Sequence, residues 1–262
     1  MPFDLPAYLA RVGFDGPREP GADGLAALHR AHVLAVPFEN LDVQMGLPIR
    51  LDADALFEKL VARRRGGYCF EQNTLFLAAL SALGFDAIAC EARVASETDP
   101  AAVRPRTHMV LVVRTGAGAV LCDVGFGGDG PLEPVPLDGR EVEQLGDRLR
   151  VEARASALVL RLLREGTWRD VYAFVPEERF PVDFEVATWY TSTHPGSRFV
   201  TTLTAQLIRP DGRHVLRNLD YSVRLGSRVS SRTIRREELL PLLREAFGVD
   251  LPEGSRFRAL DP

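Results

Sequence analysis

Lysine and cysteine are scarce in this chain of 262 residues, which has one lysine, Lys59, and three cysteines. A disulfide framework is not indicated, because the cysteines are few and their number is odd: Cys69, Cys90 and Cys122. This composition indicates a reducing compartment. No stretch approaches the roughly 18 apolar residues that a membrane span needs, and the chain does not open with a charged segment followed by an apolar one. We therefore expect a cytoplasmic protein without a membrane partner.

The chain also lacks long runs of charged residues of one sign. The formal net charge is −4, and the basic residues other than Lys59 are arginines spread along the chain, with a local run at 63–65. This pattern gives no electrostatic footprint for nucleic acid. No histidine has cysteine or histidine partners at metal-ligand spacing, so we expect no metal. The glycine-rich stretch 125–130 lacks the Lys-Ser/Thr pair of a phosphate-binding Walker loop.

Apolar residues recur at helical spacing in the first part of the chain and again near its end. The pattern predicts helices over 25–36, 52–61 and 70–83. A further helix is predicted near 237–247, where Pro241 is tolerable only if it lies in the first turn.

Between these helices the sequence pattern predicts β-strands. Apolar runs occur at 87–95, 107–114 and 119–124, and the runs 158–164 and 169–175 face each other as a hairpin across 165–168. A later strand is predicted over 199–208, followed by a turn at 210–212 and a return strand. Helices, then strands, then a mixed segment, without βαβ alternation, predict an α+β fold with an antiparallel sheet or barrel in the middle.

The densest chemical signal is the segment 65–73, Arg-Gly-Gly-Tyr-Cys-Phe-Glu-Gln-Asn. Its two glycines allow a tight turn and close approach by other groups. Cys69 follows at the start of a predicted helix, where the positive end of the helix dipole favours a thiolate. Cys69 is therefore the candidate nucleophile. The competing interpretation, a small buried hydrophobe, is the one that we favour for Cys90 and Cys122.

His108 and Asp123 are candidates to assist this thiol. Each is unremarkable alone, because a histidine on an apolar strand is usually a core residue and an aspartate at a strand end usually forms a turn. Their two short apolar runs suit neighbouring strands of one hairpin, so the side chains can meet. We expect Asp123 to orient His108, and His108 to activate Cys69.

These motifs resemble those of the arylamine N-acetyltransferase family. The segment 65–73 is similar to the catalytic signature of that family. Further similar segments occur in the same order at 36–41, at 107–109 with 122–127, and at 189–193 with 197–199. The resemblance covers essentially the whole chain. It implies ping-pong transfer of an acetyl group from acetyl-CoA to an aromatic amine, hydroxylamine or hydrazine, all of them small molecules.

The resemblance also implies an arrangement of domains and of site residues. Residues 1–86 would form a helical domain, 87–190 a β-barrel domain and 191–262 an α/β lid, with the triad arranged as in cysteine proteases. By position, the family triad falls on Cys69, His108 and Asp123. The acceptor pocket falls on Phe38, Val94, Phe126 and Phe199, and the region that receives CoA falls on Thr107, Gly125, Gly127 and Gly128.

Three alternatives stay open at this point. A family relative could close a polyketide chain as an amide synthase, with the same triad acting on a carrier-bound acyl group. A Cys-His-Asp hydrolase or a transglutaminase-like enzyme shares the triad but would cleave amides without CoA. A non-catalytic binding module would have an unreactive Cys69. The sequence does not predict the physiological acceptor, the acyl-chain preference or the oligomeric state.

Overall fold

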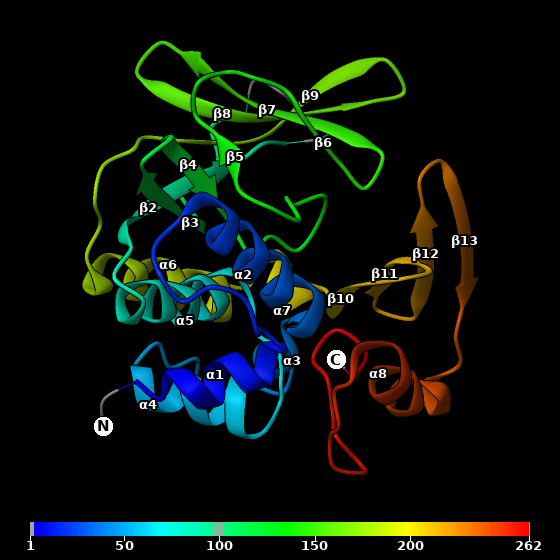
Figure 1. Ribbon diagram of the computed structural model, residues 1–262. Helices are drawn as coiled ribbons and strands as arrows, with labels where there is room; N and C mark the ends of the chain where they lie inside the picture. Colours follow the sequence, from blue (N-terminus) through cyan, green and yellow to red (C-terminus); the bar gives the residue numbers. More distant parts are fainter. Residues whose placement is uncertain (1–2, 97–98, 100–101, 262) are drawn as a thin grey trace.

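The first third of the chain is helical in the computed structural model, which describes residues 3–96, 99 and 102–261 (Figure 1). The elements in chain order are α1 (Leu5–Val12), α2 (Ala22–Ala35), β1 (Phe38–Glu39), α3 (Leu41–Gln44), α4 (Ala53–Leu56), the π-helical turn η1 (Phe57–Ala62) and α5 (Cys69–Ala82). The three predicted helices are confirmed as α2, as α4 with η1, and as α5. Helix α1 was not predicted, because two turns are too few to establish a period.

Helix α5 begins at Cys69 because the preceding segment is held extended against β1. A Cβ atom on Gly66 would lie 2.1 Å from the Pro37 carbonyl oxygen, so only glycine permits this approach. Tyr68 is extended, with φ −99° and ψ −174°, and helical geometry starts with the next residue. The Tyr68 N–H donates to Glu71 Oε2 at 3.1 Å, which satisfies an amide next to the helix start.

The middle of the chain forms an antiparallel sheet of eight strands that nearly closes into a barrel, at the top of Figure 1. One edge strand, β5, contacts β7, the strand next to the opposite edge. The spatial order is β5-β4-β3-β2-β9-β8-β7-β6. The strands are β2 (Asp86–Val94), β3 (His108–Thr115), β4 (Gly118–Cys122), β5 (Val135–Pro136), β6 (Val142–Gln144), β7 (Asp147–Arg154), β8 (Ala157–Arg164) and β9 (Thr167–Phe174).

The hairpin predicted in this region is confirmed, but its turn is shorter than expected. Thr167 and Trp168 already belong to β9, so the turn consists of Glu165 and Gly166 alone. Both have positive φ, 51° and 75°, which matches the twist of the flanking strands.

The last third combines helices with a second antiparallel sheet. Its elements are α6 (Pro181–Thr193), α7 (Arg198–Thr201), β10 (Thr204–Arg209), β11 (Gly212–Arg217), β12 (Asp220–Leu225), β13 (Arg228–Thr233), the 3-10 turn η2 (Arg236–Glu238) and α8 (Leu239–Phe247). The helix predicted near 237–247 is confirmed, and Pro241 lies in the first turn of α8. The strand predicted over 199–208 is wrong at its start, because Ser197 caps the short α7 by accepting the Phe199 N–H at 3.2 Å.

The three parts are tied together by backbone pairing. Strand β1 of the helical part pairs with β10, which gives the second sheet its order β1-β10-β11-β12-β13. The Thr204 N–H extends this junction by donating to Asn40 Oδ1 at 2.8 Å. Helix α5 packs on β2 and β3 of the barrel. The α+β fold is thereby confirmed, while the boundaries 1–86, 87–190 and 191–262 stay predictions whose outer limits, Met1 and Pro262, lie outside the described residues.

No helix within the described ranges is long and apolar enough to cross a membrane.

Candidate active site

Cys69 occupies the first position of α5 and is 2% exposed. Its Sγ lies 3.8 Å from the carbonyl oxygen of Thr107. The residue that precedes His108 therefore adjoins the predicted nucleophile. The first hydrogen bond of the helix runs from the Gln72 N–H to the Tyr68 carbonyl at 3.0 Å, which leaves the earlier amides, including that of Cys69, without a helical acceptor.

His108 and Asp123 form a direct, buried pair. Nε2 of His108 lies 2.7 Å from Oδ2 of Asp123. Because the carboxylate accepts at Nε2, the other ring nitrogen, Nδ1, is the one available to the Cys69 sulfur. The predicted contact is present, but Asp123 lies one residue beyond β4 and not inside the strand expected over 119–124.

The charges of this pair stabilise each other. Burial alone would lower the pKa of His108, but the Asp123 carboxylate and the Cys69 sulfur outweigh it and raise that pKa to about 10. Burial would likewise raise the pKa of Asp123, but the His108 charge, with hydrogen bonds that include one from Asn73, keeps it below its ordinary value. The structure thus favours an imidazolium next to a carboxylate at neutral pH.

Two further side chains that the sequence analysis did not select hold Asp123 in place. Asn73 Nδ2 donates to Asp123 Oδ1 at 3.0 Å and to the Met109 carbonyl at 2.9 Å. The Asp123 N–H donates to Nε2 of His29 at 3.0 Å. Asn73 follows Cys69 by four residues and so lies on the same helix face, a spacing that could have indicated its role. No local signal marks His29, which lies on α2.

Tyr172 on β9 is a third buried neighbour that sequence reasoning missed. Its ring centroid lies 5.0 Å from that of His108 and 5.3 Å from that of Phe126. Burial, followed by the charge of Asp123, raises the pKa of Tyr172 well above its usual range. The tyrosine therefore stays neutral and covers the His108–Asp123 pair from the barrel side.

The residues expected to line an acceptor pocket fall into two groups. Phe38 and Phe199 contact each other with ring centroids 6.1 Å apart. Phe126 packs edge-on against His108 at 5.1 Å. Val94 lies at the end of β2, directly opposite Tyr172 in the β2–β9 ladder. Their role in binding an acceptor stays a prediction.

The glycine-rich loop after Asp123 passes between the start of α5 and the second sheet. A Cβ atom on Gly125 would lie 2.8 Å from the Cα of Cys69, and one on Gly127 would lie 2.2 Å from the Phe38 ring. Both positions therefore require glycine. Across the loop, the carbonyl of Gly128 accepts a hydrogen bond from Arg213 Nη1 at 2.6 Å. The contacts predicted between CoA and this loop, like that of Thr107, stay predictions.

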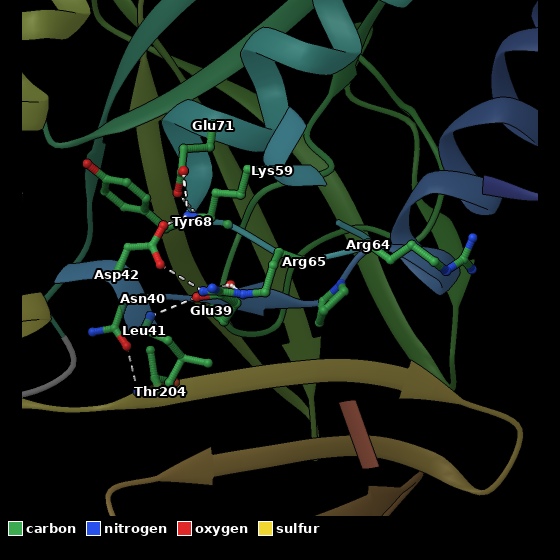
Figure 2. A network of polar contacts seen from close by, with 12 residues as sticks. Glu39, Asn40, Leu41, Asp42, Lys59, Arg64, Arg65, Tyr68, Glu71 and Thr204 are labelled. Carbon is green, nitrogen blue, oxygen red and sulfur yellow. Dashed lines mark hydrogen bonds and ion pairs between the residues drawn. The ribbon is translucent and has the colours of Figure 1, made fainter. Parts of the chain in front are cut away.

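A buried network of charges supports the start of α5 (Figure 2). Lys59 Nζ lies 2.7 Å from both Asp42 Oδ2 and Glu71 Oε1. Arg65 Nη2 lies 2.7 Å from Glu39 Oε1 and 2.9 Å from Asp42 Oδ1. Because Glu71 also accepts a backbone N–H next to the helix start, the network fixes the position of the helix that begins with the predicted nucleophile.

No group of three or more histidine, cysteine, aspartate or glutamate side chains gathers as a metal site among residues 3–96, 99 and 102–261. Asn73, His108 and Asp123 are held by hydrogen bonds within the protein, whereas the buried hydroxyl of Tyr172 has no hydrogen-bond partner among the described residues.

Comparison with known proteins identifies the family of the chain. The sequence matches the N-acetyltransferase family over residues 22–256. An arylamine N-acetyltransferase of Mycolicibacterium smegmatis is 40% identical over 257 residues, which cover 96% of this chain and 94% of that protein. The solved structure of arylamine N-acetyltransferase from M. tuberculosis matches with a TM-score of 0.93 and 37% identity, covering 99% of this chain and 100% of that one.

A structure of Mycobacterium marinum arylamine N-acetyltransferase in complex with CoA matches with a TM-score of 0.89 and 36% identity, covering 94% of this chain and 93% of that one. Fold and sequence together define an acyltransferase. The chain belongs to the arylamine N-acetyltransferase family.

Proposed function

We propose that this enzyme transfers an acetyl group from acetyl-CoA to arylamines, arylhydroxylamines or hydrazines through a thioester on Cys69. The observation that carries the proposal is the His108–Asp123 pair, 2.7 Å apart and buried, beside a cysteine at a helix start. The CoA complex of the M. marinum relative supports the choice of acyl donor.

In the first half-reaction the Cys69 thiolate attacks the acetyl carbonyl carbon of acetyl-CoA. Amides at the start of α5, including that of Cys69, would donate to the oxygen that becomes negative in the tetrahedral intermediate. The bond between the carbonyl carbon and the CoA sulfur breaks, and the imidazolium of His108 gives its proton to the departing CoA thiolate. One thioester replaces another, so the step is nearly level in free energy.

In the second half-reaction the acceptor nitrogen attacks the acetyl carbon on Cys69. The bond from carbon to Sγ breaks, Cys69 leaves as a thiolate, and His108 takes the proton released by the nitrogen. Arylamines are mostly unprotonated at neutral pH and can attack directly. The aromatic side chains of Phe38, Phe126 and Phe199 would exclude the water that otherwise hydrolyses the acyl-enzyme.

The acyl-enzyme is tested by intact-mass measurement after incubation with acetyl-CoA alone. We expect one added acetyl group, lost in the Cys69→Ser variant. Acetylation of a lysine would not confuse the result, because the single lysine, Lys59, is only 14% exposed and is paired with two carboxylates. Acetylation of Cys90 or Cys122 in place of Cys69 would contradict the assignment.

The acceptor class is tested by following the release of free CoA thiol with a panel of arylamines and hydrazines. Turnover that depends on these acceptors supports the proposal. An enzyme that turns over no free arylamine but releases a cyclised product from a carrier-bound acyl chain would be an amide synthase. Net amide hydrolysis without CoA would identify a hydrolase. The cytoplasmic location stays a prediction.

A further inference from the structure

His29, a buried histidine of α2, bridges the two ends of the glycine-rich loop. Its Nε2 accepts the backbone N–H of Asp123 at 3.0 Å, and its Nδ1 lies 2.9 Å from the carbonyl oxygen of Leu132. Asp123 is the first residue after β4, and Leu132 lies three residues before β5. One imidazole ring, 0% exposed, thus joins helix α2 to both ends of the segment that follows β4.

These two partners determine which nitrogen of His29 carries the proton. A backbone N–H can only donate, so Nε2 must present its lone pair to Asp123. A backbone carbonyl can only accept, so Nδ1 must carry the hydrogen toward Leu132. Only the neutral tautomer protonated on Nδ1 satisfies both bonds. Protonation of Nε2 would break the bond to the amide of Asp123.

The surroundings of His29 keep its imidazole neutral and fix the orientation of the ring. Burial lowers its pKa to about 4, although the bond to Leu132 and the charge of Asp123 act in the opposite direction. The ring packs edge-on against Phe76 of α5, with centroids 5.7 Å apart and planes at 90°. Asp123 and His32 are the titratable groups that interact with it.

We propose that His29 is a positioning residue for acetyl transfer, which holds Asp123 by its backbone so that the carboxylate meets His108. This inference rests on the proposed function. Asp123 has left the ladder of β4, so no strand partner fixes its backbone, and the bond to His29 takes that place. His29 acts on the reaction only through Asp123 and does not touch the reacting atoms.

The tautomer is tested by NMR of the full-length protein labelled with ¹⁵N-histidine. We expect the His29 proton on Nδ1 and a scalar coupling across the hydrogen bond, or slow amide exchange, at Asp123. A proton on Nε2 would overturn the proposal, because that nitrogen could not then accept from Asp123. This measurement does not depend on activity. It therefore tests the hydrogen bond between His29 and Asp123 even if wild type forms no acyl-enzyme and the proposed function fails.

The positioning role is tested with two variants that each keep one bond. In His29→Gln the side-chain oxygen can still accept the Asp123 N–H. In His29→Asn the shorter amide can still donate to Leu132, but the Asp123 N–H loses its acceptor. The matched control is His32→Asn on the same helix, since His32 packs on the same Phe76 ring but bonds to Tyr8 and Gln72.

We expect His29→Asn to slow acetylation of Cys69 by about tenfold or more, the scale of one lost buried hydrogen bond, and His29→Gln to stay within about threefold. In His29→Asn, the pH profile for inactivation of Cys69 by iodoacetamide should shift toward the profile of Asp123→Asn. In His29→Gln and His32→Asn the profile should stay as in wild type. A purely structural role would affect His29→Asn and His32→Asn alike, in melting temperature and in rate. A wild-type profile in a folded His29→Asn variant would overturn the proposal. If that variant does not fold, a folded His29→Gln variant that acetylates Cys69 more than about tenfold more slowly than wild type would overturn it, because glutamine keeps the acceptor for the Asp123 N–H.

Discussion

Asn73 links the helix that begins at Cys69 directly to the carboxylate of Asp123. Its Nδ2 donates to Asp123 Oδ1 at 3.0 Å, and its Oδ1 accepts the Val124 N–H at 3.1 Å. The helix of the predicted nucleophile and the carboxylate predicted to orient His108 are therefore connected directly by one side chain. The distance between Cys69 and Asp123 therefore does not depend on the conformation of the loop after Asp123 alone.

The first prediction concerns this link. Asn73→Ala leaves the Val124 N–H and the Met109 carbonyl buried without their partner, so the free energy of unfolding should fall by about 1–3 kcal/mol. Acetylation of Cys69 should also slow, because Asp123 loses a donor to Oδ1. The control is Thr74→Val on the next residue, whose hydroxyl donates to the Met109 sulfur at 3.6 Å. Equal acetylation rates in the two variants would show that Asn73 has no part in orienting Asp123.

The second prediction concerns Asp123 itself. Its Oδ2 accepts from His108, and its Oδ1 accepts from Asn73 and from the Gly125 N–H at 3.1 Å. An asparagine has one oxygen and one NH₂ group, so it cannot accept on both sides. If its oxygen faces Asn73, its NH₂ group faces Nε2 of His108 and forces the proton onto Nδ1.

That tautomer cannot take a proton from Cys69, so Asp123→Asn should lose most of its activity. The analogous change in a serine protease costs about four orders of magnitude in turnover. We expect a smaller but still drastic loss, since a thiolate needs less assistance than a serine. The measurement is the rate of acyl-enzyme formation, with a melting curve to verify folding. A folded variant within about threefold of wild type would remove Asp123 from the mechanism.

The local part of this site could be predicted from the sequence because its signals are local. Two glycines, a cysteine and a helical period lie within one short segment, and they correctly indicate that Cys69 begins a helix. The His108–Asp123 contact could be predicted because both residues flank neighbouring strands of one hairpin, although Asp123 lies just past its strand.

The supporting residues could not be predicted, because their partners lie far along the chain and are often backbone groups. His29 meets the amide of a residue 94 positions away, and no pattern around α2 reports that contact. Helix α6 escaped prediction for another reason. Val182, Val186 and Trp189 are exposed, so apolar residues lie on both faces of α6 and hide its period.

The third prediction concerns stability and pH. The pKa of His108 is raised to about 10 in the folded protein, against an ordinary value of about 6.5 when unfolded. The stabilisation by the His108–Asp123 pair should be fully present below pH ~6.5 and be lost as pH rises through ~10. In this window the folded state binds one more proton, so the free energy of unfolding should fall with a slope of at most about 1.4 kcal/mol per pH unit.

Urea unfolding from pH ~6.5 upward measures this slope, in a Cys69→Ala background so that the thiol does not titrate. Because the Cys69 sulfur also raises the pKa of His108, the pH window in this background should end below about 10. The matched protein carries Asp123→Asn in addition and should have a much flatter dependence. Parallel curves for the two proteins would mean that the pair does not carry its charge across this range.

The last prediction concerns Lys59, the single lysine, which pairs with the buried Glu71 and the partly buried Asp42. Lys59→Met keeps much of the aliphatic volume but leaves Glu71, 2% exposed, and Asp42 without their shared cation. Breaking a buried ion pair from one side typically costs about 3–5 kcal/mol, so we expect a loss of this size in urea unfolding. Adding Glu71→Gln should recover part of it, because the amide is neutral and can still accept the Tyr68 N–H. Arg63→Ala, which breaks an exposed pair with Glu58, should cost no more than about 1 kcal/mol. If Lys59→Met is no more damaging than Arg63→Ala, the network in Figure 2 does not stabilise the start of α5.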